Sequence, residues 1–249
     1  ASMIGRPNVS AEEIGTLIEK DQVLSAKVLR LANSPFYGFP SRIASVAHAV
    51  VVLGLNVVKG LTLCATAFDM MRNAGMNELW RHSLGVAMTA HILGTKAAMK
   101  NPEEVFVAGL LHDIGKVVLY VKWPDVGQQI TTVTRNTSQP LMDVEQELFE
   151  VTHADVGGWL ASAWHLPTSL REPILHHHTP AAAQDAKLQT AIVHVADVLV
   201  KGLACGNPGD NLVPPLSRQA WDLVGLDAQS LAHCLTQATE EFQTIDDYL

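Results

Sequence analysis

The chain has 249 residues, of which 48% are hydrophobic and 17% are charged, and its formal net charge is −8. This composition is typical of a folded globular chain with one large domain or two small ones, so it excludes disordered and collagen-like proteins. The negative charge argues against direct nucleic-acid binding, and no apolar stretch approaches the ~20 residues that a membrane helix needs.

The cysteines also bear on the class of protein. Cys64, Cys205 and Cys234 are far apart and form no CxxC pair, which predicts reduced thiols and a cytoplasmic location. The sequence begins with Ala1 and lacks an initiator methionine, which leaves open whether it is excised from a longer protein.

Helical periodicity runs through almost the whole chain, and we predict an all-α fold. The first predicted helix, Ser10–Leu31, opens with a capping box of Ser10 and Glu13 and is interrupted near Asp21.

The next apolar segment, Val46–Met71, contains Gly54 and Gly60, which favours two buried helices. Periodicity alone leaves a strand over Val50–Leu55 as an open alternative.

The helical pattern is stronger from Glu78 onward, with prolines between the segments. The predicted helices are Asn77–Met99, Glu103–Val121, Gly127–Thr137, Asp143–Glu150, His153–Trp164, Ser169–His178, Asp185–Lys201, Ser217–Val224 and Gln229–Asp246. A weak boundary near residues 73–75 divides an N-terminal helical lobe (1–75) from a second helical domain (76–249).

One predicted helix contains charges where its pattern requires burial. Val105–Val121 is almost wholly apolar except for His112, Asp113 and Lys116, and helical spacing places these three on one side. An unpaired buried carboxylate costs several kcal/mol, so proteins pair it or give it to a metal. For Lys116 a plain ion pair with Asp113 and a catalytic role are equal alternatives.

The same anomaly recurs at Asp197, within the apolar segment Ala191–Val200. Imidazoles and carboxylates occur at further positions with useful spacing. The candidate metal ligands are Glu78, His82, His112, Asp113, His153, His177, His178 and Asp197. Such a set, without thiolate, suits Fe, Mn, Ni or Zn and argues against a structural zinc site.

The alternative interpretations are structural. A single buried histidine is more often a satisfied core residue than a ligand, and Glu78 alone is typical of a solvated charge. We leave His176 and His194 out of the ligand set, although His194 could orient a ligand without being one.

These residues resemble a known pattern. His82, the run Leu110–Lys116 with its His112-Asp113 doublet, and Asp197 are similar to the H…HD…D signature of the HD superfamily of metal-dependent phosphohydrolases. The first half, from Asp21 to Leu63, resembles the HDOD variant through AKVLRLANSPFYG and AVVVLGLNVVKGLTL.

The HDOD resemblance implies an all-helical bacterial signalling module, often joined to receiver or other regulatory domains. Most members are thought to have lost the HD residues and to act without catalysis. We therefore expect a regulatory output domain that retains an HD-type metal site and works with a protein partner or flanking signalling domain. The aromatic turn Asn33–Phe39 is a candidate contact patch, whereas the sequence does not determine the oligomeric state.

The chain also resembles the HD-GYP group, which degrades cyclic di-GMP. His153, the doublet His177-His178 and Lys116 match that pattern, but Thr179 follows the doublet and no Gly-Tyr-Pro occurs. The alternative to a regulator is thus an active phosphohydrolase or phosphodiesterase acting on a nucleotide or cyclic dinucleotide.

If the protein is an enzyme, the resemblance implies one or two divalent transition metal ions, with Asp113 as the bridge. His82, His112 and Asp197 would hold one ion, and His153, His177 and His178 the other. Asp113 and Lys116 are then the catalytic residues, with Lys116 stabilising the developing negative charge.

Overall fold

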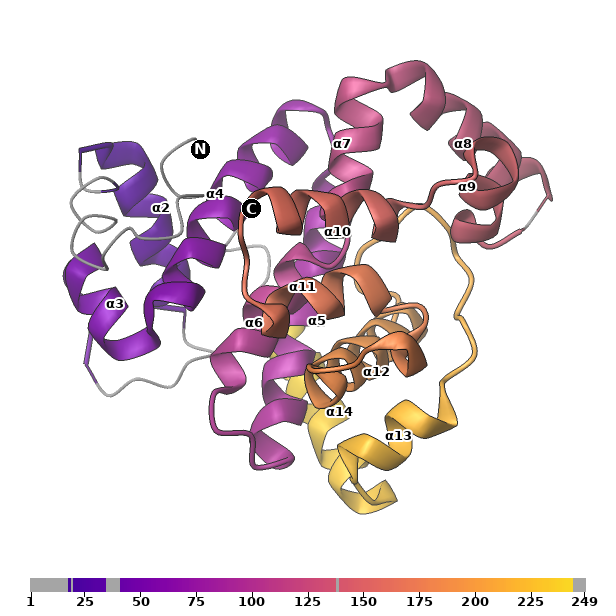
Figure 1. Ribbon diagram of the computed structural model, residues 1–249. Helices are drawn as coiled ribbons and strands as arrows, with labels where there is room; N and C mark the ends of the chain where they lie inside the picture. The colour runs from indigo at the N-terminus through magenta and orange to yellow at the C-terminus, as the bar shows by residue number, and fades with distance from the viewer. Residues whose placement is uncertain (1–17, 19, 35–40, 138, 244–249) are drawn as a thin grey trace.

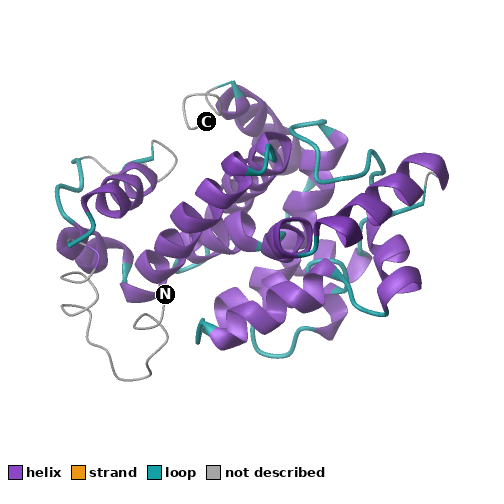
Figure 2. Cartoon of the chain, turned by 90° about the horizontal axis from the view of Figure 1, so that it is seen from above, coloured by secondary structure: helices purple, strands orange, loops and turns teal. Residues whose placement is uncertain are grey.

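The computed structural model describes residues 18, 20–34, 41–137 and 139–243, and all regular structure in those ranges is helical, which confirms the predicted all-α fold (Figure 1, Figure 2). The first helices are α2 (Gln22–Ala32), α3 (Val46–Leu53), α4 (Leu55–Asn73), α5 (Asn77–Lys96), α6 (Pro102–Leu111), α7 (Ile114–Lys122) and α8 (Pro124–Thr137). They are followed by α9 (Leu141–Phe149), α10 (His153–Ala163), α11 (Thr168–His176), the short 3₁₀ helix η2 (Pro180–Ala182), α12 (Lys187–Gly202), α13 (Arg218–Val224) and α14 (Ala228–Phe242).

Helix starts and breaks follow local chemistry. The predicted interruption near Asp21 is the start of α2, where the Asp21 carboxylate accepts the Leu24 N–H at 3.0 Å. Gly54 separates α3 from α4 with φ of 86°, so Val50–Leu55 is helical apart from this break and forms no strand. The predicted capping box at Ser10 lies outside the described residues.

Small residues let the central helices approach closely. A Cβ on Gly109 of α6 would lie 2.7 Å from the Ala87 Cα on α5. A Cβ on Gly115 of α7 would lie 1.9 Å from the His153 carbonyl oxygen at the start of α10. These contacts bring α5, α6, α7 and α10 together around one point.

The main core continues across the predicted domain boundary. Buried side chains of α2, α3 and α4 belong to the same hydrophobic cluster as those of α5, α6 and α12. The boundary itself falls in the turn after α4, where Gly75 has φ of 71°. The division into 1–75 and 76–249 stays a prediction.

Helices α8 and α9 form an arm at the edge of the molecule (Figure 1). They enclose a small core of their own, made by Ile130, Leu141 and Val144. Among the described helices, none has the length and apolar character required to cross a membrane.

The prediction of one continuous helix over Glu103–Val121 is wrong. The structure ends α6 at Leu111 and begins α7 at Ile114, and the Lys116 N–H bonds to the Asp113 carbonyl at 3.0 Å. His112 keeps helical backbone angles, and the chain departs from them at Asp113, with φ of −97° and ψ of 13°. The break lets both side chains face the same buried centre.

Candidate metal centre

The structure brings seven of the eight predicted ligands together at one buried place, with Lys116 beside them. They come from α5, from the turn between α6 and α7, from the start of α10, from the residues after α11, and from α12. The residues are His82, His112, Asp113, His153, His177, His178 and Asp197.

Local sequence chemistry fixes two of these positions. Thr152 and Asp155 form a capping box, with the Asp155 carboxylate accepting the Thr152 N–H at 2.9 Å, and this makes His153 the first residue of α10. Helix α11 ends at His176, and the next two histidines follow its last turn, His177 as the C-cap. The doublets at 112–113 and 177–178 therefore each lie directly after the last residue of a helix.

Asp113 lies at the centre of the cluster. Its Oδ2 is 3.3 Å from His112 Nε2 and 3.9 Å from His82 Nε2. Its Oδ1 is 3.3 Å from His153 Nε2 and 3.8 Å from His177 Nε2. The two oxygens of one carboxylate thus face two separate sets of imidazoles.

The first set is completed by Asp197 of α12. Asp197 Oδ1 is 3.0 Å from His82 Nε2 and 3.9 Å from His112 Nε2. Asp113 and Asp197 therefore approach the same two imidazole nitrogens from different helices.

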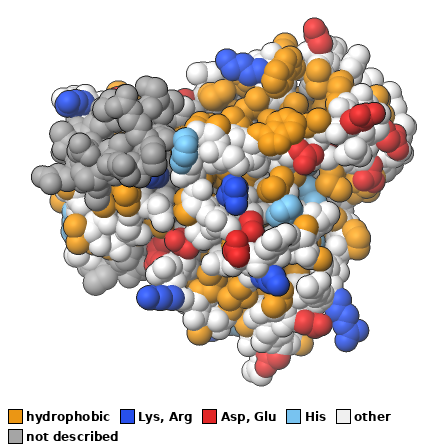
Figure 3. Space-filling view, viewed as in Figure 1, with side chains coloured by type: hydrophobic (Ala, Val, Ile, Leu, Met, Phe, Trp, Pro, Cys, Tyr) orange, Lys and Arg blue, Asp and Glu red, His pale blue; other side chains and the backbone are white. Residues whose placement is uncertain are grey.

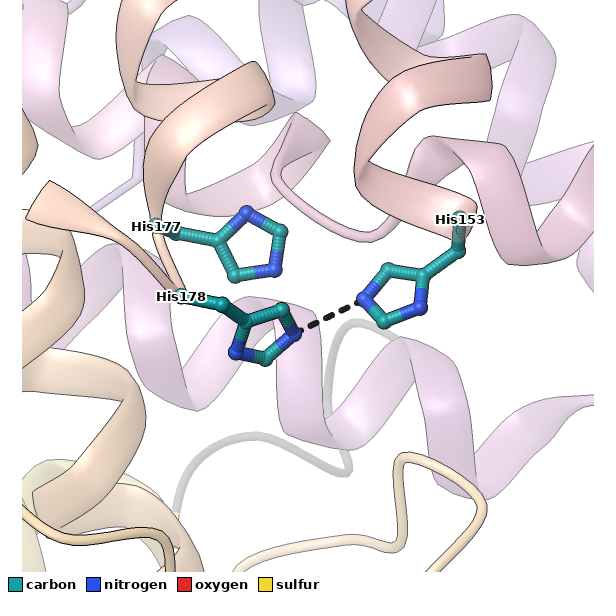
Figure 4. Close-up of side chains that lie close together, drawn as sticks. All are labelled: His153, His177 and His178. Carbon is teal, nitrogen blue, oxygen red and sulfur yellow. Dashed lines mark hydrogen bonds between the residues drawn. The ribbon is translucent and has the colours of Figure 1, made fainter. Parts of the chain in front are cut away.

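The second set consists of three histidines whose ligand atoms all lie within 4.8 Å of one another. His153 Nε2 and His178 Nε2 are 2.9 Å apart (Figure 4), and the rings of His177 and His178 have centroids 4.0 Å apart. Figure 4 shows the three rings converging from α10 and the end of α11.

The second ring nitrogen of three histidines is held by the protein. His112 Nδ1 donates to the Gly109 carbonyl at 2.7 Å, and His177 Nδ1 donates to the Ile174 carbonyl at 2.9 Å. His153 Nδ1 donates to Glu145 Oε2 at 2.6 Å. A donating Nδ1 leaves the Nε2 lone pair directed at the centre, which is the tautomer that a metal ligand needs.

Glu145 is a functional residue that the sequence analysis missed. It is fully buried on α9, and its Oε2 also accepts the His153 backbone N–H at 2.8 Å. Its helix is short and amphipathic, so no pattern marks this glutamate as different from its exposed neighbours.

His194 orients a neighbouring residue. Its Nδ1 donates to the His177 carbonyl at 2.7 Å, and its Nε2 accepts the Ser217 N–H at 3.0 Å. Both ring nitrogens are therefore used, and His194 fixes the backbone of His177 without being available as a ligand.

The electrostatics favour ionised carboxylates and, at His177 and His178, neutral imidazoles, whereas at His112 the effect of burial is outweighed by the negative charge of Asp113, which raises the pKa. Burial raises the pKa of Asp113, but the neighbouring His112 and Lys116 outweigh it and hold that pKa well below its usual range. Burial lowers the pKa of His177 and of His178 well below the usual value. These are the protonation states that a cation requires of its ligands.

Several buried polar atoms of the cluster have no hydrogen-bond partner among the described residues. They are His82 Nε2, His112 Nε2, Asp113 Oδ1, His177 Nε2 and Asp197 Oδ1. Orphaned buried atoms are costly, and these all face one another. Their N and O chemistry, with the three cysteines buried elsewhere, fits a divalent metal. On the face seen in Figure 3, histidine surface is visible in a few small, separate patches.

Glu78 is the predicted ligand that the structure does not bring into the buried cluster. It is exposed in the first turn of α5, and its carbonyl accepts the Asn207 N–H at 3.1 Å. A ligand role for its carboxylate stays a prediction.

Comparison with known protein families identifies the family of this chain. The HDOD domain model matches residues 1–180. The chain belongs to the HDOD domain family. The resemblance inferred from the sequence is therefore confirmed.

Relatives of this HDOD domain include an uncharacterised protein of Treponema pallidum, 26% identical over 215 residues; the chain spans only 42% of that relative, while the match covers 84% of the chain. A solved HDOD domain protein of unknown function from Geobacter sulfurreducens is 28% identical with a TM-score of 0.75, covering 100% of this chain and 89% of that one. A solved protein of Shewanella amazonensis, provisionally named a phosphohydrolase, is 20% identical with a TM-score of 0.60. The match covers 95% of this chain and 90% of the Shewanella chain, and it shows only that the two share a fold.

Proposed function

We propose that this HDOD domain is a signal-transduction output domain whose buried centre holds two divalent transition metal ions. The observation that supports it is the position of Asp113, whose two carboxylate oxygens face two different sets of imidazoles at 3.3 Å. A carboxylate in a structural ion pair needs only one set of imidazoles beside it. A carboxylate that bridges two cations has one set of ligands on each side.

The two sets define which residues would hold each ion. His82, His112 and Asp197 belong to the first, while three histidines belong to the second. Nitrogen and oxygen ligands without sulfur favour Fe, Mn, Ni or Zn over a purely oxygen-bound Mg²⁺ or Ca²⁺.

A second candidate function, phosphoester hydrolysis, is favoured by Lys116. Two bound ions would supply a nucleophile at neutral pH by lowering the pKa of water, and would polarise a phosphoryl oxygen. The Lys116 ammonium lies 2.8 Å from Asp113 Oδ2 and is buried, so it can stabilise negative charge on the same phosphoryl group. Glu145 keeps the proton of His153 on Nδ1.

The regulatory partner also stays a proposal. The chain spans less than half of its Treponema relative, which leaves room in such a protein for a flanking signalling domain. Most of the aromatic segment proposed as a contact patch, residues 35–39, lies outside the described residues. The three cysteines are buried thiols far apart in the sequence, which is typical of a reducing compartment, so we propose the cytoplasm as the location.

Metal content and hydrolysis, measured together, test both functions. Protein purified without chelator from cells grown with iron and manganese is analysed for metals and assayed on bis(p-nitrophenyl) phosphate, a generic phosphodiester. We expect about two metal equivalents per chain and metal-dependent hydrolysis, both lost in Asp113→Asn. Asp222→Asn, at an exposed position of α13, is the matched control.

The outcomes separate the two functions. Metal without hydrolysis rejects the enzyme and keeps the metal-holding output domain. Protein that stays free of metal after growth and after direct titration rejects both.

A further inference from the structure

A cavity of about 550 Å³ lies next to the metal centre. Its wall is built by the start of α5, by α7 and α8, and by the segment 207–212, which runs past the α8–α9 arm (Figure 1). The volume falls in the range of small-molecule sites, roughly 300–1,000 Å³. Lys116 belongs both to this wall and to the cluster around Asp113.

Lys116 has unused hydrogen-bonding capacity at this junction. An ammonium has three donors, and the hydrogen bond to Asp113 Oδ2 uses one of them. The side chain is only 2% exposed, so bulk water does not satisfy the remaining two. An acceptor-rich group in the cavity would therefore find hydrogen-bond donors at Lys116, through which the cavity adjoins the cluster around Asp113.

The rest of the polar lining is also richer in free donors than in free acceptors. Arg135 lines the cavity and forms no ion pair within the described ranges, and the buried hydroxyl of Thr134 has no hydrogen-bond partner there. The carboxylate of Asp210 is already used, because it accepts the Leu141 N–H at 2.9 Å and lies 3.5 Å from Lys201 Nζ.

Two further features of the lining indicate what kind of ligand the cavity suits. Glu78, the other lining carboxylate, is exposed, so water screens its charge. Met76, Leu79 and Leu212 add an apolar surface to the same cavity. The lining therefore suits an anionic group joined to an apolar or planar organic group.

We propose that this cavity binds the organic group of a phosphate ester, of about mononucleotide size, whose phosphoryl oxygens contact Lys116. The proposal rests on the phosphoester hydrolysis proposed above, and it names where the substrate lies. Arg135 and Thr134 donate hydrogen bonds to acceptors of the organic group. The apolar side chains that line the cavity pack against the ring of that group.

The test measures binding without turnover. The probe is the phosphonate analogue of adenosine 5′-monophosphate, whose P–C bond resists hydrolysis, titrated by calorimetry into the full chain as purified. Adenosine alone and inorganic phosphate alone are the comparison ligands. The variants are Arg135→Gln and Thr134→Val, with Arg218→Gln and Thr132→Val as matched controls at exposed positions.

We expect saturable binding of the phosphonate, at least about tenfold tighter than either comparison ligand. Arg135→Gln weakens it about tenfold and Thr134→Val about threefold, and the controls leave it unchanged. Unchanged affinity in both cavity variants, equally tight binding of phosphate alone, or no binding at millimolar concentration would overturn the proposal.

Failure of this proposal is distinguishable from failure of the proposed function. Metal content and hydrolysis of bis(p-nitrophenyl) phosphate are measured on the same cavity variants. A protein that binds metal and hydrolyses this small diester, yet ignores the phosphonate, keeps its function and loses this cavity as the substrate site.

Discussion

Replacing Glu145 by glutamine separates the two halves of the metal centre. Glu145 forms hydrogen bonds to the centre through His153, accepting the backbone N–H at 2.8 Å and Nδ1–H at 2.6 Å. The amide of Glu145→Gln has the same shape and keeps an acceptor oxygen, but it loses the negative charge. The hydrogen bonds and ion pairs described for the first set of ligands, His82, His112 and Asp197, do not include Glu145, so this set should be unaffected.

The size of the effect follows from these two hydrogen bonds. A hydrogen bond to a charged group contributes about 1.5–3 kcal/mol, against about 0.5–1.5 kcal/mol for a neutral one, so two bonds lose about 2 kcal/mol. This corresponds to roughly a 30-fold change in affinity. It agrees with the 10–100-fold loss, as an order of magnitude, that follows removal of a carboxylate behind a ligating histidine.

Competition with a chelator of known affinity measures both metal-binding steps. In Glu145→Gln we expect the affinity of one metal-binding step to fall by about 10–100-fold and that of the other to stay constant, with unchanged circular dichroism. Glu147→Gln, at an exposed position of the same helix, should change neither step. If Glu145→Gln lowered the affinities of both metal-binding steps equally, or changed neither, the reasoning would be refuted.

Three further predictions follow from the packing and charge of the centre. Gly115→Ala should destabilise the fold by about 3 kcal/mol or more in urea unfolding, because its Cβ would lie 1.9 Å from the His153 carbonyl oxygen, whereas Gly202→Ala, with nothing within 4 Å, should be close to neutral. Lys116→Met should leave metal content intact but lower hydrolysis at least about 100-fold, since it removes only the ammonium beside Asp113; unchanged turnover would contradict that role. Removing the metal with chelator should lower the melting temperature, and adding Mn²⁺ in excess should restore it, because ions that bind only the folded state stabilise it.

The central residues could be predicted because burial and charge conflict in the sequence. Asp113 and Asp197 stand in segments that are otherwise mostly apolar, and both are buried at the centre with 1% exposure. Their partners could be assembled only through the resemblance to HD proteins, because α5, α10 and α12 are distant in sequence. Local periodicity contains no information about which helices meet.

The features that were missed depend on tertiary structure. Glu145 looks like an ordinary surface glutamate on a short amphipathic helix, and only the packing of the α8–α9 arm buries it. The break after Leu111 has no proline or glycine signal at the doublet itself, and it follows from the need for His112 and Asp113 to face one point. Glu78 has ligand spacing with His82, but it is exposed at the beginning of its helix.

Anomalous X-ray scattering from crystals grown with Mn²⁺ or Fe²⁺ tests the central claim most directly. The account predicts two anomalous peaks, one on each side of the Asp113 carboxylate, the first among His82, His112 and Asp197 and the second among the three histidines of the other set. A single peak would limit the centre to one ion. The absence of any peak, with Lys116 as the only cation beside the Asp113 carboxylate, would contradict the account.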